Sequence, residues 1–133
     1  MLILDVPPQR LSRTSFMQAA LRQALRSNCR FPMGAILTQG NRVLASAPNK
    51  KRNSPMIDYR HSTFHAEEAV LRRVSNTEGA TIYVARVNAR RQPAMAKPCG
   101  RCQQAMLQAG VRRVFYTSHT GVVQGMVLLQ DPM

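Results

Sequence analysis

The chain has 133 residues, enough to bury an apolar core without disulfide bonds, and we expect a single domain over residues 1–133. Its 19 Lys and Arg residues against 6 Asp and Glu give a net charge of +13, spread from Arg10 to Arg113. This distribution excludes a disordered basic tail. The excess favours nucleic acid or a nucleotide as the partner, with a basic surface that serves only solubility as the alternative.

The cysteines and the N-terminal sequence bear on the cellular compartment. Three cysteines, two of them three positions apart, are typical of metal or redox chemistry rather than of a disulfide scaffold. The opening MLILDVPP is interrupted by Asp5 and Pro7, so it predicts neither a signal peptide nor a membrane span. We therefore expect a cytoplasmic protein with no membrane partner, in which Cys29 is a small, buried or half-buried hydrophobic residue.

The predicted elements follow from apolar periodicity and from turn residues. Helices are expected at three places and strands at five, with a hairpin turn at Gly40–Asn41 and with Pro98 and Gly110 bounding the third helix. The helices are predicted over residues 12–27, from about His65 to Val74, and over 98–110; the strands are predicted over 34–38, 42–47, 80–87, 111–118 and 122–130.

The order α-β-β-α-β-α-β-β predicts an α/β protein with three α-β-α layers and a mixed five-stranded sheet. The unit from Thr81 to Tyr116 should be parallel with a right-handed crossover. Only a short turn separates the last two strands, whereas a parallel return needs roughly a dozen residues. The last strand is therefore predicted to be antiparallel.

Two short motifs, HAE and PCGRC, carry the candidate chemistry. Cys99 and Cys102, three apart in a first helical turn, point to one side and can bind one zinc ion, and a helix N-terminus lowers the thiol pKa. His65 also falls near a helix start, so two adjacent helix N-termini would supply three ligands and leave the fourth position for water. Glu67 could then take a proton from that water and hand it to a substrate.

A structural zinc site with two Cys and two His ligands is the alternative. His61 lies four residues before His65, at helical spacing, although the sequence DYRHS is typical of a loop. His119 lies in the turn SHTG, where a turn residue is commoner than a ligand. Glu68 is interpreted as a solvated carboxylate that the helix dipole favours.

The two motifs together match the H-x-E…P-C-x-x-C signature of zinc nucleobase deaminases. The stretches FPMGAILTQGNRVLASAPN, HAEEAVLRRV, ATIYVARV and PCGRCQQAML resemble, over most of the chain, the hairpin, first zinc helix, strand and second zinc helix of the cytidine deaminase superfamily. The resemblance implies zinc bound by His65, Cys99 and Cys102, with Glu67 as the proton shuttle. It also implies hydrolytic loss of ammonia from cytosine or adenine.

Substrate contacts are also expected from the resemblance. Asn49 matches the asparagine that contacts the substrate sugar in many members, and the backbone at Ala66 matches the position that hydrogen-bonds the base. We add Lys51, Phe64 and Pro98 to the predicted substrate-binding residues, with core packing as the alternative for Phe64.

Two departures from the family pattern concern the substrate. Enzymes that act on free cytidine typically have N-x-E after the second strand, whereas this chain has NKK followed by Arg52, which favours a nearby phosphate over a bare sugar. The loop NARRQPAMAK is longer than usual and carries Arg90, Arg91 and Lys97. An antiparallel last strand, by contrast, resembles the branch that holds free-nucleoside enzymes and several bacterial toxin deaminases.

The leading hypothesis is a zinc-dependent hydrolytic deaminase that converts cytosine to uracil in a phosphate-bearing substrate, with single-stranded nucleic acid favoured. Phe64, Tyr59 and Tyr116 are the candidate stacking residues. One alternative is a deaminase of free cytidine, deoxycytidine or their monophosphates, assembled as a homo-oligomer. The other is a non-enzymatic, zinc-containing module that binds nucleic acid.

Overall fold

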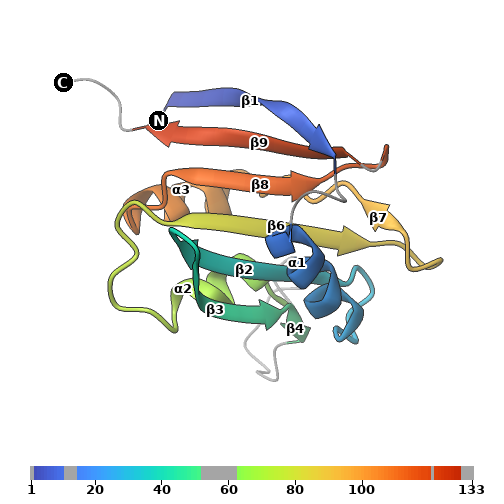
Figure 1. Ribbon diagram of the computed structural model, residues 1–133. Helices are drawn as coiled ribbons and strands as arrows, with labels where there is room; N and C mark the ends of the chain where they lie inside the picture. The colour runs from blue at the N-terminus through green and yellow to red at the C-terminus, as the bar shows by residue number, and fades with distance from the viewer. Residues whose placement is uncertain (1, 11–14, 52–62, 121, 130–133) are drawn as a thin grey trace.

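The computed structural model describes residues 2–10, 15–51, 63–120 and 122–129. Within these ranges a central sheet is covered by one helix on one face and by two helices on the other (Figure 1). No helix in this part of the chain is long and apolar enough to cross a membrane. The elements, in chain order, are β1 (Leu2–Arg10), α1 (Ser15–Leu25), β2 (Met33–Gln39), β3 (Arg42–Pro48), β4 (Lys50–Lys51), β5 (Thr63–Phe64), α2 (Ala66–Leu71), β6 (Thr81–Val87), β7 (Pro93–Ala94), α3 (Gly100–Gln108), β8 (Arg113–Thr117) and β9 (Val122–Leu129).

The central sheet has the strand order β1-β9-β8-β6-β2-β3, and β7 pairs with β6. Strands β6 and β8 are parallel and are connected through α3, while β9 runs antiparallel to β8. The predicted α/β class, the parallel unit and the antiparallel last strand are therefore confirmed. A separate two-stranded sheet, β4-β5, leads into α2.

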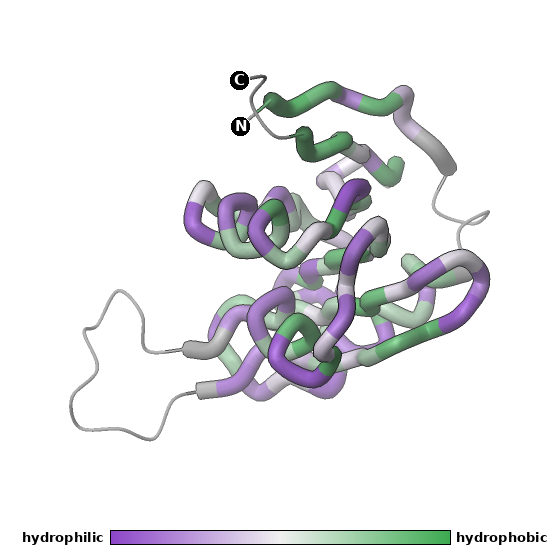
Figure 2. The backbone as a smooth tube through the Cα atoms, turned by 90° about the vertical axis from the view of Figure 1, so that its left-hand side faces the viewer, coloured by the Kyte–Doolittle hydropathy of each residue, from purple (hydrophilic) through white to green (hydrophobic). Residues whose placement is uncertain are grey.

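The sheet has more strands than the five predicted, and β1 is the main reason. It pairs antiparallel with β9 from Leu2 opposite Leu129 to Arg10 opposite Val122, and the two apolar strands lie side by side at one edge of the molecule (Figure 2). Proline normally argues against a strand, because it cannot donate to the ladder. Here Pro7 falls within a shift of register on an edge strand, where that missing donor is tolerated.

Helix boundaries differ from the prediction by a few residues. α1 is shorter than the predicted range 12–27, of which residues 12–14 lie outside the described part. α2 ends at Leu71 rather than near Val74, and Val74 packs instead against the apolar cluster beneath α2 and α3. The chain thus leaves the helix after Leu71, and Val74 is packed against the core from outside the helix.

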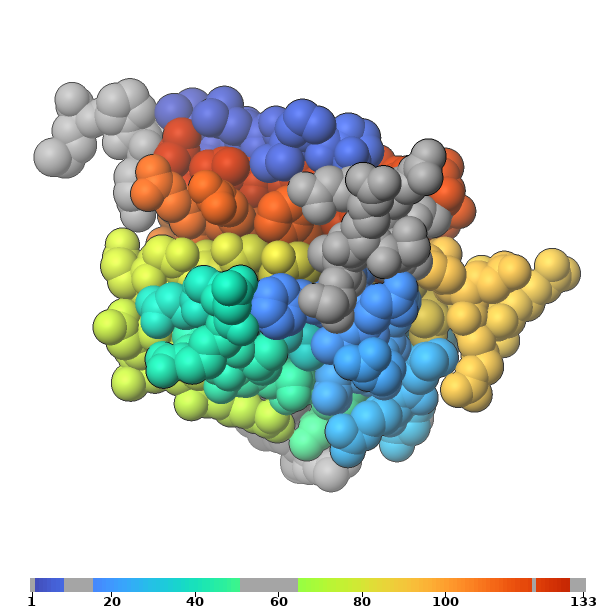
Figure 3. Space-filling view, in the orientation of Figure 1, coloured from blue at the N-terminus to red at the C-terminus, as the bar shows by residue number. Residues whose placement is uncertain are grey.

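The segment between β6 and α3 was predicted as a loop but contains the short strand β7. The side chain of Asn88 accepts hydrogen bonds from the backbone N–H groups of Arg90 and Gln92, and Arg91 adopts a φ of 63°. These features fold the chain back so that Ala94 pairs with Arg86. The turn projects from the body of the molecule (Figure 3), with Arg90 and Arg91 exposed on it.

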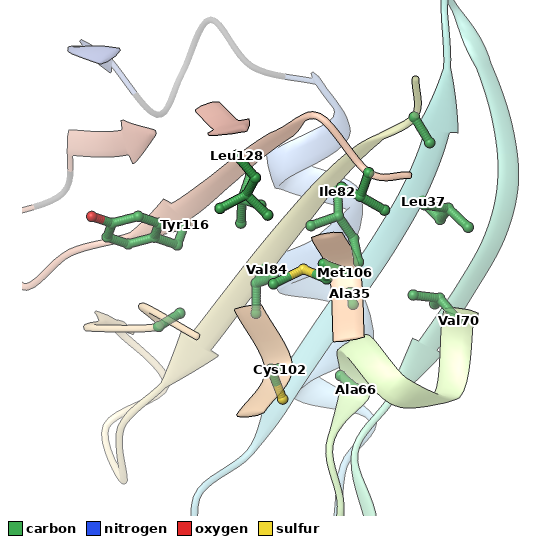
Figure 4. Close-up of a cluster of buried hydrophobic side chains, with 14 of the residues drawn as sticks. Ala35, Leu37, Ala66, Val70, Ile82, Val84, Cys102, Met106, Tyr116 and Leu128 are labelled. Carbon is green, nitrogen blue, oxygen red and sulfur yellow. The ribbon is translucent and has the colours of Figure 1, made fainter. Parts of the chain in front are cut away.

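β6 shows how the sheet divides the core into two clusters. Ile82 and Val84 belong to the cluster beneath α2 and α3, whereas Tyr83 and Ala85 belong to the cluster beneath α1. This alternation is what the period of two along a strand requires. Cys102 also belongs to the first cluster, so the start of α3 is anchored in the apolar core (Figure 4).

Gly34 sets how closely α1 approaches the sheet. A Cβ atom at this position would lie 2.3 Å from the carbonyl oxygen of Ala20 and 2.4 Å from the backbone nitrogen of Ala24. Both atoms belong to the helix backbone, which cannot move aside as a flexible side chain could. The residue must therefore be glycine for β2 and α1 to pack at this distance.

We expect Gly34→Ala to lower the free energy of unfolding by about 1–3 kcal/mol or more, because the added methyl group overpacks the contact between helix and sheet. Urea unfolding of both proteins would measure the difference. Gly100→Ala is the matched control, since an added Cβ there meets no atom within 4 Å. Equal stability of the Gly34→Ala variant and the wild type would contradict the packing argument.

Candidate metal centre and active site

The candidate site is built from the first residues of α2 and α3, which contact each other on one face of the sheet. His65 is the N-cap of α2 and Cys99 is the N-cap of α3, both with extended backbone. An N-cap side chain usually accepts a hydrogen bond from the first helical turn. Neither residue makes such a bond, so the imidazole and the thiol remain available to another partner.

His65, Cys99 and Cys102 converge on one point. Their potential ligand atoms all lie within 4.8 Å of one another, and Cys102 Sγ is 3.1 Å from His65 Nδ1. Cys102 is buried, His65 is half-buried and Cys99 is exposed, so the cluster opens to solvent on one side. One imidazole and two thiols with an open side match the donors of a catalytic zinc site.

The candidates for a fourth protein ligand do not join this cluster among the described residues. His119 is exposed in the turn after β8, as the turn sequence predicted, and it is absent from the group. His61 lies outside the described residues. Cys29 is buried elsewhere as an apolar residue. The described part of the chain therefore offers three ligands rather than four.

Glu67 lies directly beside the cluster in the first turn of α2. It is only 1% exposed, and its Oε1 has no hydrogen-bond partner in the described part of the chain. Burial raises the pKa of Glu67, and a backbone hydrogen bond and the charge of His65 oppose that shift. A buried carboxyl with a raised pKa and one free oxygen is suited to accepting and returning a proton.

Cys102 differs from the prediction that a helix N-terminus lowers the thiol pKa. Burial raises the pKa of Cys102 well above its ordinary value, and the charges of Glu67 and Cys99 raise it further. Desolvation outweighs the helix dipole here because the sulfur sits in the apolar cluster. A divalent cation would reverse this balance by binding the thiolate directly. The donor set and the surplus of negative groups therefore fit zinc.

Two contacts that sequence reasoning missed hold the helix starts in place. The buried side chain of Gln103 donates a hydrogen bond of 2.9 Å to the carbonyl of Pro98, next to Cys99. Arg101 of α3 forms an ion pair with Glu68 of α2, so Glu68 joins the two helices rather than being fully solvated. A glutamine at a core position of a helix was the available signal for the first contact.

Asn49 is placed by a network that braces the loop before β2. Its Oδ1 accepts hydrogen bonds from the backbone N–H of Met33, at 3.0 Å, and from the hydroxyl of Ser27. Its Nδ2 donates to the carbonyl of Phe31 at 2.9 Å. Among the described residues this uses one of the two amide hydrogens, so the other is available for the predicted sugar contact.

The other predicted substrate residues have mixed positions. Ala66 and Pro98 are buried at the starts of α2 and α3. Lys51 lies on β4, opposite Thr63, and Phe64 lies on β5, opposite Lys50 and just before His65; the side chains of Lys51 and Phe64 lie outside the described atoms. Of the other candidate stacking residues and cations, Tyr116 belongs to the core rather than to a stacking surface, and Tyr59 and Arg52 lie outside the described residues.

Residues 11–118 match the family model described as the cytidine and deoxycytidylate deaminase zinc-binding region. The chain therefore belongs to this deaminase family, as the resemblance implied, and the metal of the family is zinc.

A tRNA-specific adenosine deaminase of Agrobacterium fabrum is 32% identical over 112 residues, which cover 78% of this chain and 64% of that protein. The crystal structure of cytidine deaminase from Burkholderia pseudomallei aligns with a TM-score of 0.67 at 23% identity, over 90% of this chain and 97% of that one. A dCMP deaminase of the cyanophage S-TIM5, in complex with dCMP and dUMP, aligns with a TM-score of 0.60 at 22% identity, over 79% of each chain. These two structures share the fold of this chain.

We expect the purified protein to contain about one zinc ion per chain, and His65→Ala, Cys99→Ala and Cys102→Ala each to lose most of it. Elemental analysis after dialysis would measure the metal content. Cys29→Ala is the control, because it removes a buried thiol outside the cluster and should retain the zinc. Equal zinc content in all variants would place the metal elsewhere.

We expect Glu67→Gln to stabilise the metal-free protein at neutral pH by about 1–3 kcal/mol, because a neutral amide replaces a desolvated carboxyl. Since the folded pKa of Glu67 is raised above 4.5, folding retains a proton that the unfolded chain releases above that pH. The advantage of the variant should therefore shrink as the pH falls towards 4.5. Urea unfolding in a chelator would measure it across pH. Glu78→Gln, at an exposed position, should show no such gain.

Proposed function

We propose that this protein is a zinc-dependent hydrolytic deaminase that converts cytosine to uracil in a phosphate-bearing substrate. The observation that carries the proposal is the buried carboxyl of Glu67, one oxygen of which has no partner among the described residues, beside three converging metal-binding side chains. A structural zinc site has no need of an unpartnered buried carboxyl, because such a group is costly to keep.

His65, Cys99 and Cys102 are assigned as the residues that hold zinc. When bound, zinc lowers the pKa of a water molecule to about 7 and so supplies a nucleophile for attack on C4 of cytosine. Glu67 takes one proton from the attacking water and delivers it to the ring nitrogen. It then carries the second proton of that water to the amino nitrogen, so that the C4–N bond breaks, the C4 carbonyl forms and ammonia leaves. Its raised pKa lets it hold the proton between these transfers. The backbone N–H of Ala66 lies in the first turn of α2, where N–H groups lack intrahelical partners, and is assigned to base recognition.

The phosphate-bearing substrate is supported by the distribution of charge. The net charge is +13, and Lys50, Arg90, Arg91 and Lys97 are exposed on β4 and on the segment between β6 and α3. Such cations attract phosphates over a distance of about 10 Å at moderate ionic strength. The similar dCMP deaminase and tRNA-specific adenosine deaminase are named for phosphate-bearing substrates. Single-stranded nucleic acid is the preferred form, since a duplex would require the base to be flipped out.

A deaminase of free cytidine is the second candidate, and the antiparallel β9 favours it. The alignment with the Burkholderia pseudomallei cytidine deaminase covers 97% of that protein. Assembly into a homo-oligomer is part of this proposal, because Leu2, Ile3 and Leu4 are exposed along β1. Adenine in place of cytosine is the remaining alternative for the base, supported by the tRNA-specific adenosine deaminase relative.

We expect the zinc-loaded protein to convert cytosine to uracil in dCMP or in single-stranded oligonucleotides faster than in deoxycytidine. Mass spectrometry of a panel containing deoxycytidine, dCMP, single-stranded DNA, single-stranded RNA and an adenine-containing RNA would measure this. Glu67→Gln should reduce the rate by about 10²–10⁴-fold while zinc is retained. Binding of the oligonucleotides should weaken steeply as salt is added.

The same panel separates the alternatives. Product from nucleosides alone, with binding indifferent to salt, would favour the free-nucleoside enzyme. Inosine as the product would show that the reacting base is adenine rather than cytosine. Oligonucleotide binding by the zinc-loaded wild type without deamination of any substrate would favour a non-enzymatic binding module.

A further inference from the structure

Arg86 is a cation near the end of an otherwise largely apolar strand, and it has no ionic partner in the described part of the chain. The strand is TIYVARV, and Arg86 is half-buried in it. Its Nε is buried and makes no hydrogen bond. Only Glu67 Oε1 shares that condition among the described side-chain atoms. A buried donor without an acceptor is costly, so its persistence points to an acceptor supplied by a ligand.

The strand register places Arg86 on the same face of the sheet as the candidate metal centre. Side chains alternate along β6, and Val84, two residues earlier, belongs to the cluster that contains Cys102. Met33, directly opposite Arg86 on β2, packs against the same cluster. Arg86 therefore lies on the α2 and α3 face, roughly 7 Å further along the strand than Val84.

Phe31 holds the guanidinium group from one side. The Cζ of Arg86 lies 4.9 Å from the centroid of the Phe31 ring, and the Cζ of Arg30 lies 5.4 Å from it. Phe31 is 54% exposed, so the group formed by Arg30, Phe31 and Arg86 is open to solvent. Stacking occupies the planar face of a guanidinium and leaves its N–H donors, which lie in the plane, free for a forked contact with two oxygens.

The group of Arg30, Phe31 and Arg86 is joined to Asn49, the predicted sugar contact. The carbonyl of Phe31 accepts the hydrogen bond from Asn49 Nδ2, and Asn49 leads through β4 and β5 towards His65. The three sites therefore follow one another in space, with the metal centre first, Asn49 next and the stacked Arg86 last. A nucleotide has the same sequence of groups, namely base, sugar and phosphate.

We propose that Arg86, stacked on Phe31 and assisted by Arg30, binds the phosphate on the sugar of the reacting nucleotide. A phosphate suits this site better than a neutral acceptor because two guanidinium groups share one ring with no described carboxylate paired to either. The assignment of base and sugar rests on the proposed function, whereas the binding of phosphate by Arg86 does not.

The test is a comparison of binding by the zinc-loaded full chain, in a Glu67→Gln background that prevents turnover. Calorimetry would give dissociation constants for dCMP and for deoxycytidine. The parent should bind dCMP at least about tenfold more tightly than deoxycytidine. Arg86→Gln should reduce that ratio of affinities to about one while leaving the affinity for deoxycytidine unchanged. Arg86→Lys should give an intermediate ratio, because it keeps the charge without the planar fork.

Arg42→Gln is the matched control, because it removes the same charge at a remote place. Arg42 lies beside the hairpin turn, at the end of β3 that is far from Asn49. Phe31→Leu, at an exposed position, should weaken only the phosphate-dependent part and serves if Arg86→Gln fails to fold. The proposal would be overturned if Arg86→Gln and Arg42→Gln lost the preference for dCMP equally, or if the parent showed no such preference. A preference that depends on Arg86 without deamination by the wild type would uphold it and refute the proposed function.

Discussion

Glu67 and Cys102 are almost completely withdrawn from water where α2 and α3 begin, and this burial raises the pKa of both side chains. Placing two acidic groups in an apolar cluster opposes folding, because each loses the solvation of its charged form. The surrounding structure works against that cost. The core beneath the two helices, the Arg101–Glu68 ion pair and the hydrogen bond from Gln103 to Pro98 hold both helix starts in position. The result is a cluster of buried acidic groups that suits a divalent cation.

In the proposed function, chemistry and recognition are divided between different parts of the fold. The metal-binding groups and Glu67 stand on helix starts that are anchored in the core. The contacts assigned to the sugar and phosphate come from the loop before β2, which Asn49 ties to the end of β3, and from the end of β6. Loops can vary in sequence while a buried scaffold stays fixed. This division explains how one arrangement of metal and carboxylate is compatible with nucleosides, nucleotides or nucleic acid.

The features that the sequence predicted correctly depend on local spacing. Cys99 and Cys102 share a helical turn wherever that helix lies, and the short turn before β9 excludes a parallel return whatever the rest of the sheet does. The pairing of β1 was missed because Leu2 meets a partner at Leu129, at the other end of the chain, and its prolines argued against a strand. Arg86 was missed because a cation in a strand gains meaning only when the register shows its neighbours. The raised pKa of Cys102 was missed because burial is a property of the assembled core.

The pairing of Leu2 with Leu129 brings the first and last described residues of the sheet to the same corner. That corner lies beside the start of β8, at the opposite end of the strands from Cys99 and Cys102. A short linker could therefore join the two ends and preserve the β1-β9 register. New ends opened at the exposed turn of Gly40–Asn41, also remote from the metal centre, would give a circular permutant with every candidate site residue in its present place.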